Sequence, residues 1–315
     1  MKILVTGGTG FIGSHTVVEL TNAGFEPVIL DNLSNSNRAV LDGIREILGK
    51  VPKFYELDCR NEKELSQVFE NERPEAVIHF AAFKAVGESV EKPLEYYDNN
   101  VGSMLTLLEV MRKYKVKNFV FSSSCTVYGQ PESLPVTELS PDANAASPYG
   151  YTKVMCEQII RDSSKVCGLN SAILRYFNPI GAHPSGHIGE LPNGIPNNLV
   201  PFITQTAIGK RQKLTVFGDD YSTPDGTCIR DFIHVVDLAK AHVAALHWLL
   251  KNDNQLEVFN LGQGKGNTVL EVVKAFVKVS GQNLNYEIGP RRAGDVEQIW
   301  ANVEKSEKML AGKLN

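Results

Sequence analysis

The chain has 315 residues, a net charge of −4 and a sequence pI near 6.0; 43% of its residues are hydrophobic and 22% are charged. These values are typical of a globular enzyme, and the length predicts about two domains. The slight negative charge gives no reason to expect nucleic acid or an anionic membrane as a partner. No run of 18 apolar residues occurs, so we expect no membrane span.

The cysteines and histidines indicate neither a disulfide framework nor a metal site. The five cysteines are scattered without a C-x-x-C pair, which argues against disulfides and against a zinc thiolate site. His183 and His187 lie four residues apart, but in a loop rich in proline and glycine. These spacings predict no bound metal. The opening MKILVTGGTG reaches glycines too early for a secretory signal, so we expect a cytoplasmic protein.

The first half of the chain alternates short apolar runs with helical patterns, which predicts a parallel sheet covered by helices. The predicted strands are Ile3–Thr6, Pro27–Asp31, Lys53–Leu57, Ala76–Phe80, Phe119–Ser122 and Ala172–Arg175. The predicted helices are Ile12–Ala23, Ala39–Leu48, Glu62–Asn71, Met104–Tyr114 and Tyr149–Val166. We therefore expect an α/β fold of the doubly wound, Rossmann type.

The pattern changes after Tyr176, where residues 177–200 are rich in proline, glycine and asparagine. A helix (Leu199–Gly209), a strand (Lys213–Phe217) and a further helix (Val236–Leu250) are predicted beyond this stretch. We expect a dinucleotide-binding domain over residues 1–176 and a smaller α/β substrate domain over 177–315. The two are expected to be partly interleaved, because residues 232–262, including Val258–Leu261, could return to the main sheet.

A glycine-rich turn joins the first predicted strand to the first predicted helix. Gly7, Gly10 and Gly13 match G-x-x-G-x-x-G, and such glycines let backbone N–H groups approach a pyrophosphate at a helix N-terminus. Asp31 ends the second predicted strand, about 20 residues further on, where an acid binds the ribose 2′-hydroxyl of NAD and repels the 2′-phosphate of NADP. The sequence therefore predicts NAD as the cofactor.

Tyr149 stands four residues before Lys153, so a predicted helix places both on one face. A free tyrosine titrates near pH 10, and a neighbouring positive charge favours its ionised form. The pair could therefore act as a base beside a nicotinamide, although Y-x-x-x-K alone is common on helices. Ser124 follows a predicted strand, where its hydroxyl could relay the proton or simply form a turn.

Several longer runs carry a family resemblance: TGGTGFIG at 6–13, HFAAFKAVGES at 79–89, YYDNN at 96–100, SSSCTVYG at 122–129 and SPYGYTK at 147–153. RYFNPIGAHPSG at 175–186, GIPNNLVP at 194–201 and DGTCIRDFIHVVDLA at 225–239 extend it over nearly the whole chain. In these runs the chain resembles the extended short-chain dehydrogenase/reductase family, and within it the nucleotide-sugar 4-epimerases.

The resemblance implies an isomerase of galactose and nucleotide-sugar metabolism that interconverts UDP-galactose and UDP-glucose. Tyr149 would be the acid/base at the sugar 4-hydroxyl, Lys153 would hold the nicotinamide ribose and lower the tyrosine pKa, and Ser124 would assist. C4 would be oxidised to a 4-keto sugar, which rotates and takes the hydride back, so NAD would stay bound and be regenerated. A homodimer through helices of the Met104–Tyr114 and Tyr149–Val166 type is also implied.

The resemblance also implies the contacts to both ligands. Those to NAD are Gly7, Gly10, Phe11, Ile12, Gly13, Asp31, Asn32, Asn35, Asp58, Cys59, Phe80, Ala81, Lys84, Asn99, Ser122, Tyr149, Lys153 and Tyr176. Those to the UDP-sugar are Lys84, Ser124, Tyr149, Asn178, Asn198, Leu199, Phe217, Arg230, Arg291, Asp295 and Ile299. On chemistry alone Lys84 could equally be a solvated lysine and Asp58 a turn former.

Four alternatives stay open. At position 299 many relatives carry a tyrosine that closes the sugar pocket; the smaller isoleucine would allow a UDP-N-acetylglucosamine 4-epimerase or one of dual specificity. A 4,6-dehydratase needs an added acid and base, and this chain has no carboxylate at the corresponding positions, which are Cys125 and Thr126. This alternative therefore lacks its acid/base pair. A dehydrogenase would use the same hydride machinery with net NADH production, and a non-catalytic NAD sensor could share the fold.

Overall fold

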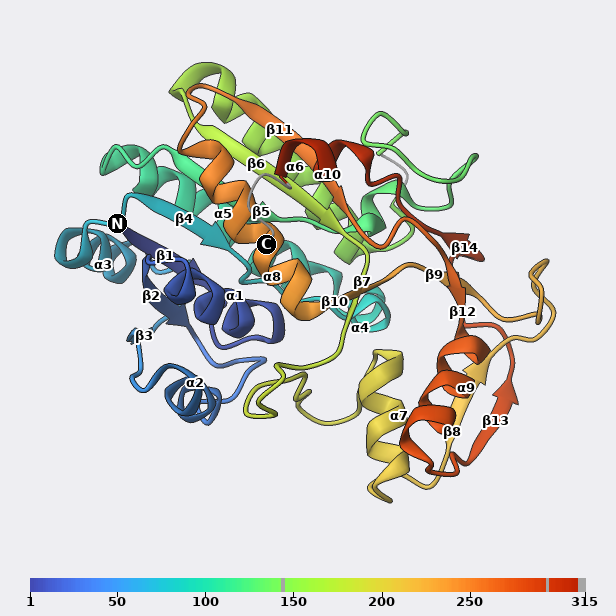
Figure 1. Cartoon of the computed structure of the whole chain (residues 1–315). Coiled ribbons are helices and arrows are strands. Elements are labelled where there is room, and N and C mark those ends of the chain that lie inside the picture. The colour runs from blue at the N-terminus through green and yellow to red at the C-terminus, as the bar shows by residue number, and fades with distance from the viewer. Residues whose placement is uncertain (143–144, 293–294, 311–315) are drawn as a thin grey trace.

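A seven-stranded parallel sheet forms the centre of the molecule in the computed structural model, which describes residues 1–142, 145–292 and 295–310 (Figure 1). The strand order is β11-β6-β5-β4-β1-β2-β3, so the chain reverses direction across the sheet beside β1. The strands are β1 (Lys2–Thr6), β2 (Glu26–Asp31), β3 (Lys53–Glu56), β4 (Ala76–His79), β5 (Asn118–Ser122), β6 (Asn170–Tyr176) and β11 (Leu256–Leu261). Ligands bind in such sheets beyond the carboxyl ends of the strands, where the order reverses.

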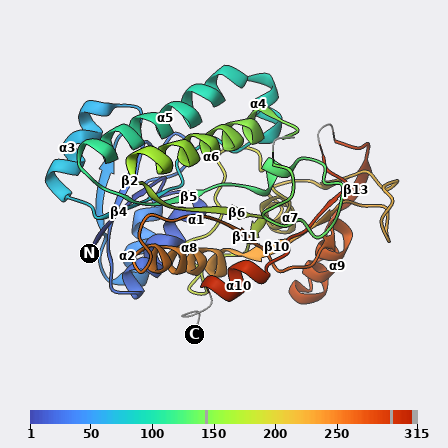
Figure 2. The ribbon, with the colours of Figure 1, turned by 90° about the horizontal axis from the view of Figure 1, so that it is seen from above.

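Helices cover both faces of this sheet (Figure 2). One layer contains α3 (Glu62–Glu72), α4 (Val86–Glu91), α5 (Pro93–Lys113) and α6 (Pro148–Cys167). The other contains α1 (Phe11–Asn22), α2 (Val40–Leu48), α8 (Val235–Leu249) and α10 (Glu304–Leu310). Each face has its own apolar core, because strands covered on both faces carry apolar side chains in both directions.

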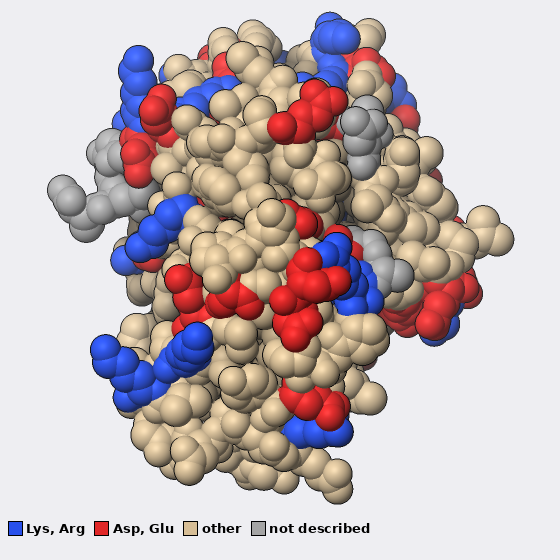
Figure 3. All heavy atoms as spheres, turned by 90° about the vertical axis from the view of Figure 1, so that its right-hand side faces the viewer, with Lys and Arg blue, Asp and Glu red and all other residues tan. Residues whose placement is uncertain are grey.

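Part of the chain after Tyr176 builds a smaller body beside the carboxyl edge of the sheet (Figure 1). It contains α7 (Leu199–Ala207), β8 (Leu214–Phe217), β9 (Ile229–Arg230), β12 (Asn267–Thr268), α9 (Val269–Ser280), β13 (Tyr286–Gly289) and β14 (Gln298–Ile299). Two further short strands, β7 (Asn178–Ile180) and β10 (Phe232–His234), pair in parallel between the two bodies. On the face seen in Figure 3, acidic and basic side chains are interspersed rather than gathered by sign.

The predicted fold class is confirmed: the structure is a doubly wound α/β fold of the Rossmann type. Every strand predicted in the first half lies within two residues of an observed one. The division into domains at residue 176 stays a prediction, although β11 pairs with β6 and so lies in the main sheet. In the described ranges no helix is long and apolar enough to cross a membrane.

One helix prediction was incomplete, and three observed helices, α4, α9 and α10, were not predicted. The helix expected over Met104–Tyr114 begins eleven residues earlier, at Pro93, since its first half is rich in polar residues that carry no apolar period. The amides of Asn99 and Asn100 are buried there and bonded to each other, which a sequence pattern does not reveal. Helix α9 was missed, although Thr268 and Glu271 form a capping box at its start.

Candidate active site

The glycine turn between β1 and α1 packs too closely for side chains. Gly7 has φ +70°, and a Cβ there would lie 2.7 Å from the backbone nitrogen of Ala81. A Cβ on Gly13 would lie 2.2 Å from the carbonyl oxygen of Gly7. The turn therefore folds tightly under the first residues of α1, whose free backbone N–H groups face an anion-binding position.

Asp31, at the end of β2, ties the loops that follow β1 and β2 together. Its carboxylate accepts hydrogen bonds from the backbone N–H of Thr9 (3.1 Å), the backbone N–H of Leu33 (2.9 Å) and the hydroxyl of Ser36 (3.0 Å). A carboxylate has about four acceptor positions, so roughly one remains for a further donor. Asp31 thus shapes the rim of the cleft and keeps capacity to bind a hydroxyl.

A cleft of about 1000 Å³ opens beyond the carboxyl ends of β1, β2 and β4, at the reversal of strand order. Its wall includes the following predicted cofactor residues: Gly7, Gly10, Phe11, Ile12, Gly13, Asp31, Asn32, Asn35, Asp58, Cys59, Phe80, Ala81, Lys84, Asn99, Tyr149, Lys153 and Tyr176. Ser122 is the exception among the predicted cofactor residues, because its side chain is buried behind the wall. The tertiary structure therefore gathers residues separated by up to 169 positions around one cleft.

Asn32 and Asp58 meet at one end of the cleft, where the Asn32 amide donates to the Asp58 carboxylate (3.1 Å). Arg60 also binds that carboxylate, with a guanidinium nitrogen at 2.8 Å. Hydrogen bonds from Arg60 lower the pKa of Asp58 to about 2. The pair is therefore an acceptor-rich rim beyond β2 and β3, at the far end of the cleft from Tyr149.

Helix α6 begins so that Tyr149 lies in its first turn. The Ser147 hydroxyl accepts a hydrogen bond from the N–H of Gly150 (3.2 Å), and Pro148 occupies the first helical position. One turn later the Lys153 ammonium donates to the carbonyl oxygen of Ser122 (2.8 Å) and lies 4.9 Å from the Phe121 ring centroid. Both Tyr149 and Lys153 are buried at the base of the cleft.

The expected lowering of the Tyr149 pKa by Lys153 stays a prediction, because burial dominates that pKa in the protein alone. Burial raises the pKa of Tyr149 well above its ordinary value, and hydrogen bonding to Ser124 opposes this only in part. Burial also lowers the pKa of Lys153 to about 8. The Lys153 ammonium lies 5.9 Å from the Tyr149 ring centroid and is bonded to Ser122 instead. The four-residue spacing of Tyr149 and Lys153 predicts that a positive charge lies near the tyrosine. It does not predict the desolvation that raises the Tyr149 pKa, because desolvation depends on burial in the folded chain.

Ser124 lies directly after β5 and caps a short 3₁₀ helix (Cys125–Tyr128). Its hydroxyl accepts a hydrogen bond from the N–H of Thr126 (3.2 Å). The side chain is 6% exposed, and the same hydroxyl hydrogen-bonds Tyr149 and lowers its pKa. Ser124 therefore forms a turn, as its residue type suggests, and also contacts the tyrosine.

Glu190 is a residue of the cleft wall that sequence reasoning missed. Its carboxylate accepts from the Lys84 ammonium (3.2 Å) and from the Asn198 amide (2.6 Å). Both partners were predicted ligand contacts, so Glu190 joins them across the cleft mouth. No local signal marks it, because it lies in an irregular loop whose course only the fold decides.

A second cluster lies in the smaller body, outside the wall of the cleft. Arg230 on β9 lies 3.7 Å from the Asp295 carboxylate, which Arg292 also binds at 2.7 Å. The Arg292 guanidinium is 5.6 Å from the centre of the Phe217 ring. One chain of contacts therefore runs from Arg230 to Asp295, from Asp295 to Arg292, and from Arg292 to Phe217. Three of these four residues, Arg230, Asp295 and Phe217, are predicted substrate contacts.

The other predicted substrate residues lie around these two groups. Arg291 stacks on Tyr221 (4.1 Å) and binds Asp220 (2.7 Å) on the exposed side. Ile299 pairs with Arg230 across β14 and β9, is 4% exposed, and packs in one apolar cluster with Val127 and Tyr128, which follow Ser124. The remaining three are Asn178 at the start of β7, Asn198 before α7 and Leu199 as its first residue.

Within the described ranges, no group of three or more histidine, cysteine, aspartate or glutamate side chains could hold a metal ion. His183 bonds the Ser185 hydroxyl (2.8 Å) within its own loop.

Comparison with known proteins agrees with this arrangement. Residues 3–262 match the model of the NAD dependent epimerase/dehydratase family. The UDP-glucose 4-epimerase of Bacillus subtilis (strain 168) is 55% identical over 311 residues, which cover 98% of this chain and 91% of that protein. The similar protein of Dictyostelium discoideum, also a UDP-glucose 4-epimerase, is 52% identical over 99% of this chain and 91% of its own length.

Solved structures agree as well. The crystal structure of UDP-glucose 4-epimerase from Bifidobacterium longum in complex with NAD+ and UDP has a TM-score of 0.95 and 49% identity, covering 99% of this chain and 92% of that one. The UDP-Glc/GlcNAc 4-epimerase from Campylobacter jejuni has a TM-score of 0.82 and 40% identity, covering 98% and 92%. These matches confirm the resemblance that the motifs indicated. The chain belongs to the NAD dependent epimerase/dehydratase family.

Proposed function

We propose that this protein is a UDP-glucose 4-epimerase, an isomerase that interconverts UDP-galactose and UDP-glucose with NAD as a retained cofactor. The observation that carries the proposal is that Tyr149 and Lys153 line the dinucleotide cleft while Ser124 hydrogen-bonds Tyr149 from behind. Relatives that share half of its sequence over nearly its whole length bear that name. The chemistry of the site is consistent with it.

The residues of the cleft fit NAD. The tight Gly7 and Gly13 turn leaves room for a pyrophosphate at the start of α1, and no Cβ could be added there without a backbone clash. Asp31 would hold a ribose hydroxyl with its remaining acceptor position and would repel a 2′-phosphate. Asn32 and Asp58 would receive the adenosine end, and Lys153 and Tyr176 the nicotinamide end. When bound, NAD supplies a hydride acceptor and donor next to Tyr149.

Tyr149 takes the proton from the sugar 4-hydroxyl and returns it. Because burial raises its pKa, the side chain is a phenol in the protein alone and needs added positive charge to act as a base. Lys153 supplies part of that charge, and an oxidised nicotinamide would supply the rest. The Ser124 hydroxyl, in contact with Tyr149, passes the proton and orients the reacting oxygen.

The smaller body holds the nucleotide sugar. Arg230 and Arg291 bind the diphosphate, because guanidinium groups match phosphate oxygens in charge and shape. Asp295 accepts from the ribose hydroxyls and Phe217 stacks near the uracil. The remaining contacts to the sugar are made by Asn178, Asn198, Leu199 and Lys84, of which Lys84 and Asn198 are hydrogen-bonded to Glu190 at the cleft mouth.

A second candidate substrate is UDP-N-acetylglucosamine. Ile299 packs with Val127 and Tyr128 just beyond Ser124, and its side chain is smaller than the tyrosine of many relatives. A larger pocket would accept the N-acetyl group as well as a hydroxyl. The similarity to a UDP-Glc/GlcNAc 4-epimerase supports testing both sugars.

The test is to incubate the purified protein with UDP-galactose, without added NAD, and to follow UDP-glucose. An epimerase forms UDP-glucose with no net NADH, and Tyr149→Phe abolishes turnover while the fold and bound NAD remain. Net NADH that depends on added NAD would identify a dehydrogenase, and a stable 4-keto-6-deoxy product a dehydratase. Bound NAD without turnover of either UDP-sugar would leave an NAD sensor.

We further propose a homodimer formed by α5 and α6. Leu94 and Leu105 lie eleven residues apart on α5, and Met155 and Val166 have the same spacing on α6, with Tyr151 one turn before Met155. These five apolar side chains are 43–85% exposed and lie on neighbouring helices of one outer layer (Figure 2). Sedimentation should give a dimer, and Leu105→Glu with Met155→Glu a monomer; a monomeric wild type would refute the proposal.

A cytoplasmic location is proposed from cysteine chemistry. All five cysteines are unpaired, and three of them are buried, as expected in a reducing compartment. Cell fractionation with an antibody to the chain tests this, and recovery of the protein outside the cytoplasm would contradict it.

A further inference from the structure

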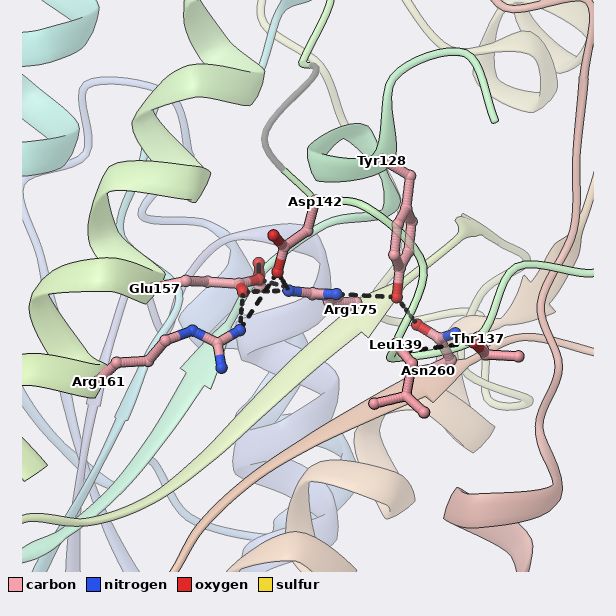
Figure 4. A network of polar contacts seen from close by, with 9 residues as sticks. Tyr128, Thr137, Leu139, Asp142, Glu157, Arg161, Arg175 and Asn260 are labelled. Carbon is pink, nitrogen blue, oxygen red and sulfur yellow. Dashed lines mark hydrogen bonds and ion pairs between the residues drawn. The ribbon is translucent and has the colours of Figure 1, made fainter. Parts of the chain in front are cut away.

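A buried charged network joins Glu157 on α6 to Arg175 on β6 and, through Tyr128, to β11 (Figure 4). Arg175, on β6, is 0% exposed, and its Nε donates to the Glu157 carboxylate on α6 (2.9 Å) while a second nitrogen binds the other oxygen of that carboxylate. Asp142 accepts from the same guanidinium. On the other side Arg175 donates to the Tyr128 hydroxyl (3.1 Å), which donates to Asn260 on β11 (2.6 Å).

Such a network is costly for stability alone. Moving charges from water into a protein interior carries a desolvation penalty that a buried ion pair recovers only in part, and an apolar replacement is often at least as stable. All the buried polar groups that Figure 4 joins to Arg175 are nevertheless paired. We therefore expect the network to fix the relative position of the elements that it joins.

The network reaches the catalytic residues through Ser123. The Ser123 hydroxyl donates to Glu157 (2.6 Å), which stands four residues after Lys153 on the same helix. Ser123 also lies between Ser122, whose carbonyl oxygen accepts from Lys153 (2.8 Å), and Ser124, which contacts Tyr149. Two hydrogen bonds one helical turn apart thus join α6 to the residues at the end of β5.

We propose that Glu157, held by Arg175 and bonded to Ser123, is a positioning residue that fixes α6 against the end of β5 and so sets Tyr149 and Lys153 opposite Ser124. This inference rests on the proposed function. Glu157 is not a catalytic residue, because it contacts neither the cleft nor Tyr149. Its effect passes through Ser123 and through the shared helix.

Glu157 also acts on Lys153 through its charge. Burial lowers the pKa of Lys153 to about 8, and the neighbouring Cys156 and Glu157 both oppose that shift. The titratable groups that face Lys153 are Tyr149, Cys156 and Glu157 on α6 and His79 on β4. His79 is neutral at physiological pH, since burial lowers its pKa to about 3. Glu157 is therefore the carboxylate among these groups, and its charge favours the protonated form of Lys153.

Two variants test the inference in the NAD-loaded enzyme. Ser123→Ala removes the link but keeps the Glu157–Arg175 pair; we expect kcat for UDP-galactose to fall roughly 10- to 100-fold with KM nearly unchanged, the cost of a slightly misplaced catalytic group. Glu157→Gln removes the charge as well. We expect the alkaline limb of its kcat profile to move to lower pH, because Lys153 loses its proton earlier.

Two controls separate positioning from stability. Asp162→Asn removes an exposed carboxylate from the same helix and should leave kcat and its pH profile unchanged. Tyr128→Phe removes a hydrogen bond on the far side of Arg175, away from Ser123, and should lower the melting temperature without shifting the pH profile. A Glu157→Gln protein that fails to fold leaves the Ser123→Ala measurement decisive.

A wild-type kcat in Ser123→Ala would overturn the inference. It would also be overturned if Tyr128→Phe lowered kcat with the same KM and the same pH profile as Glu157→Gln, because a loss of stability alone would then explain both variants. Failure of the proposed function looks different. In that case the wild-type enzyme itself would not turn over UDP-galactose, whatever the variants do.

Discussion

Gly13→Ala tests whether the glycine turn is built for a dinucleotide. In the middle of a helix, alanine is about 1 kcal/mol more favourable than glycine. At Gly13 the added Cβ would lie 2.2 Å from the carbonyl oxygen of Gly7, about 1.2 Å inside the 3.4 Å at which ordinary contact begins. The neighbouring atoms are backbone, so the turn itself must move. Overpacking of this kind costs roughly 1–3 kcal/mol, which outweighs the helical gain.

The functional effect should exceed the effect on stability. A turn displaced by about 1 Å no longer presents its N–H groups to a pyrophosphate, and the cofactor should be lost on purification. We expect Gly13→Ala to contain less than about a tenth of the wild-type NAD, measured by absorbance after acid release. Turnover without added NAD should fall in proportion, and thermal unfolding should occur at a lower temperature because bound ligand stabilises the folded state.

Gly102→Ala is the matched control. Gly102 lies inside α5, and a Cβ there would meet nothing nearer than 3.7 Å. This variant should retain NAD and activity and be more stable by up to about 1 kcal/mol. The reasoning is refuted if Gly13→Ala purifies with wild-type NAD content, or if both variants lose the cofactor equally.

Three further predictions follow from the same geometry. Asp31→Asn should weaken NAD binding by roughly 1–3 kcal/mol and reduce the preference over NADP, since the charge that holds Thr9 and repels a 2′-phosphate is gone; unchanged cofactor titrations would contradict this. Ile299→Tyr should lower turnover of UDP-N-acetylglucosamine relative to UDP-galactose about tenfold, and equal losses for both sugars would refute a role in discrimination. Lys153→Met should abolish catalysis yet stabilise the NAD-free protein at neutral pH, because burial lowers the Lys153 pKa from 10.5 to about 8, on the order of 3 kcal/mol of destabilisation. The destabilisation is complete below pH 8 and disappears as pH rises to 10.5, since over that range the unfolded chain binds a proton that the folded chain has lost. Urea unfolding of variant and wild type measures this. A stability difference between them that does not shrink between pH 8 and 10.5 would exclude the explanation.

The sequence by itself determined the central sheet and the cofactor end of the cleft. Apolar runs buried on both faces make parallel strands, and glycines with an acid about 20 residues later predict a dinucleotide turn. These signals are local, because a strand, a turn and a helix start are encoded within a few neighbouring residues. For the same reason the four-residue spacing of Tyr149 and Lys153 is enough to place both on one helix face.

The tertiary structure alone decided what surrounds those residues. Burial raises the Tyr149 pKa although a lysine lies one turn away, and a residue's distance from water is a property of the whole fold. Glu190 reaches Lys84 across 106 positions, and Glu157 reaches Ser123 and Arg175 from another element. Local pattern cannot specify such pairs, because packing of distant segments sets both their geometry and the dielectric in which their charges interact.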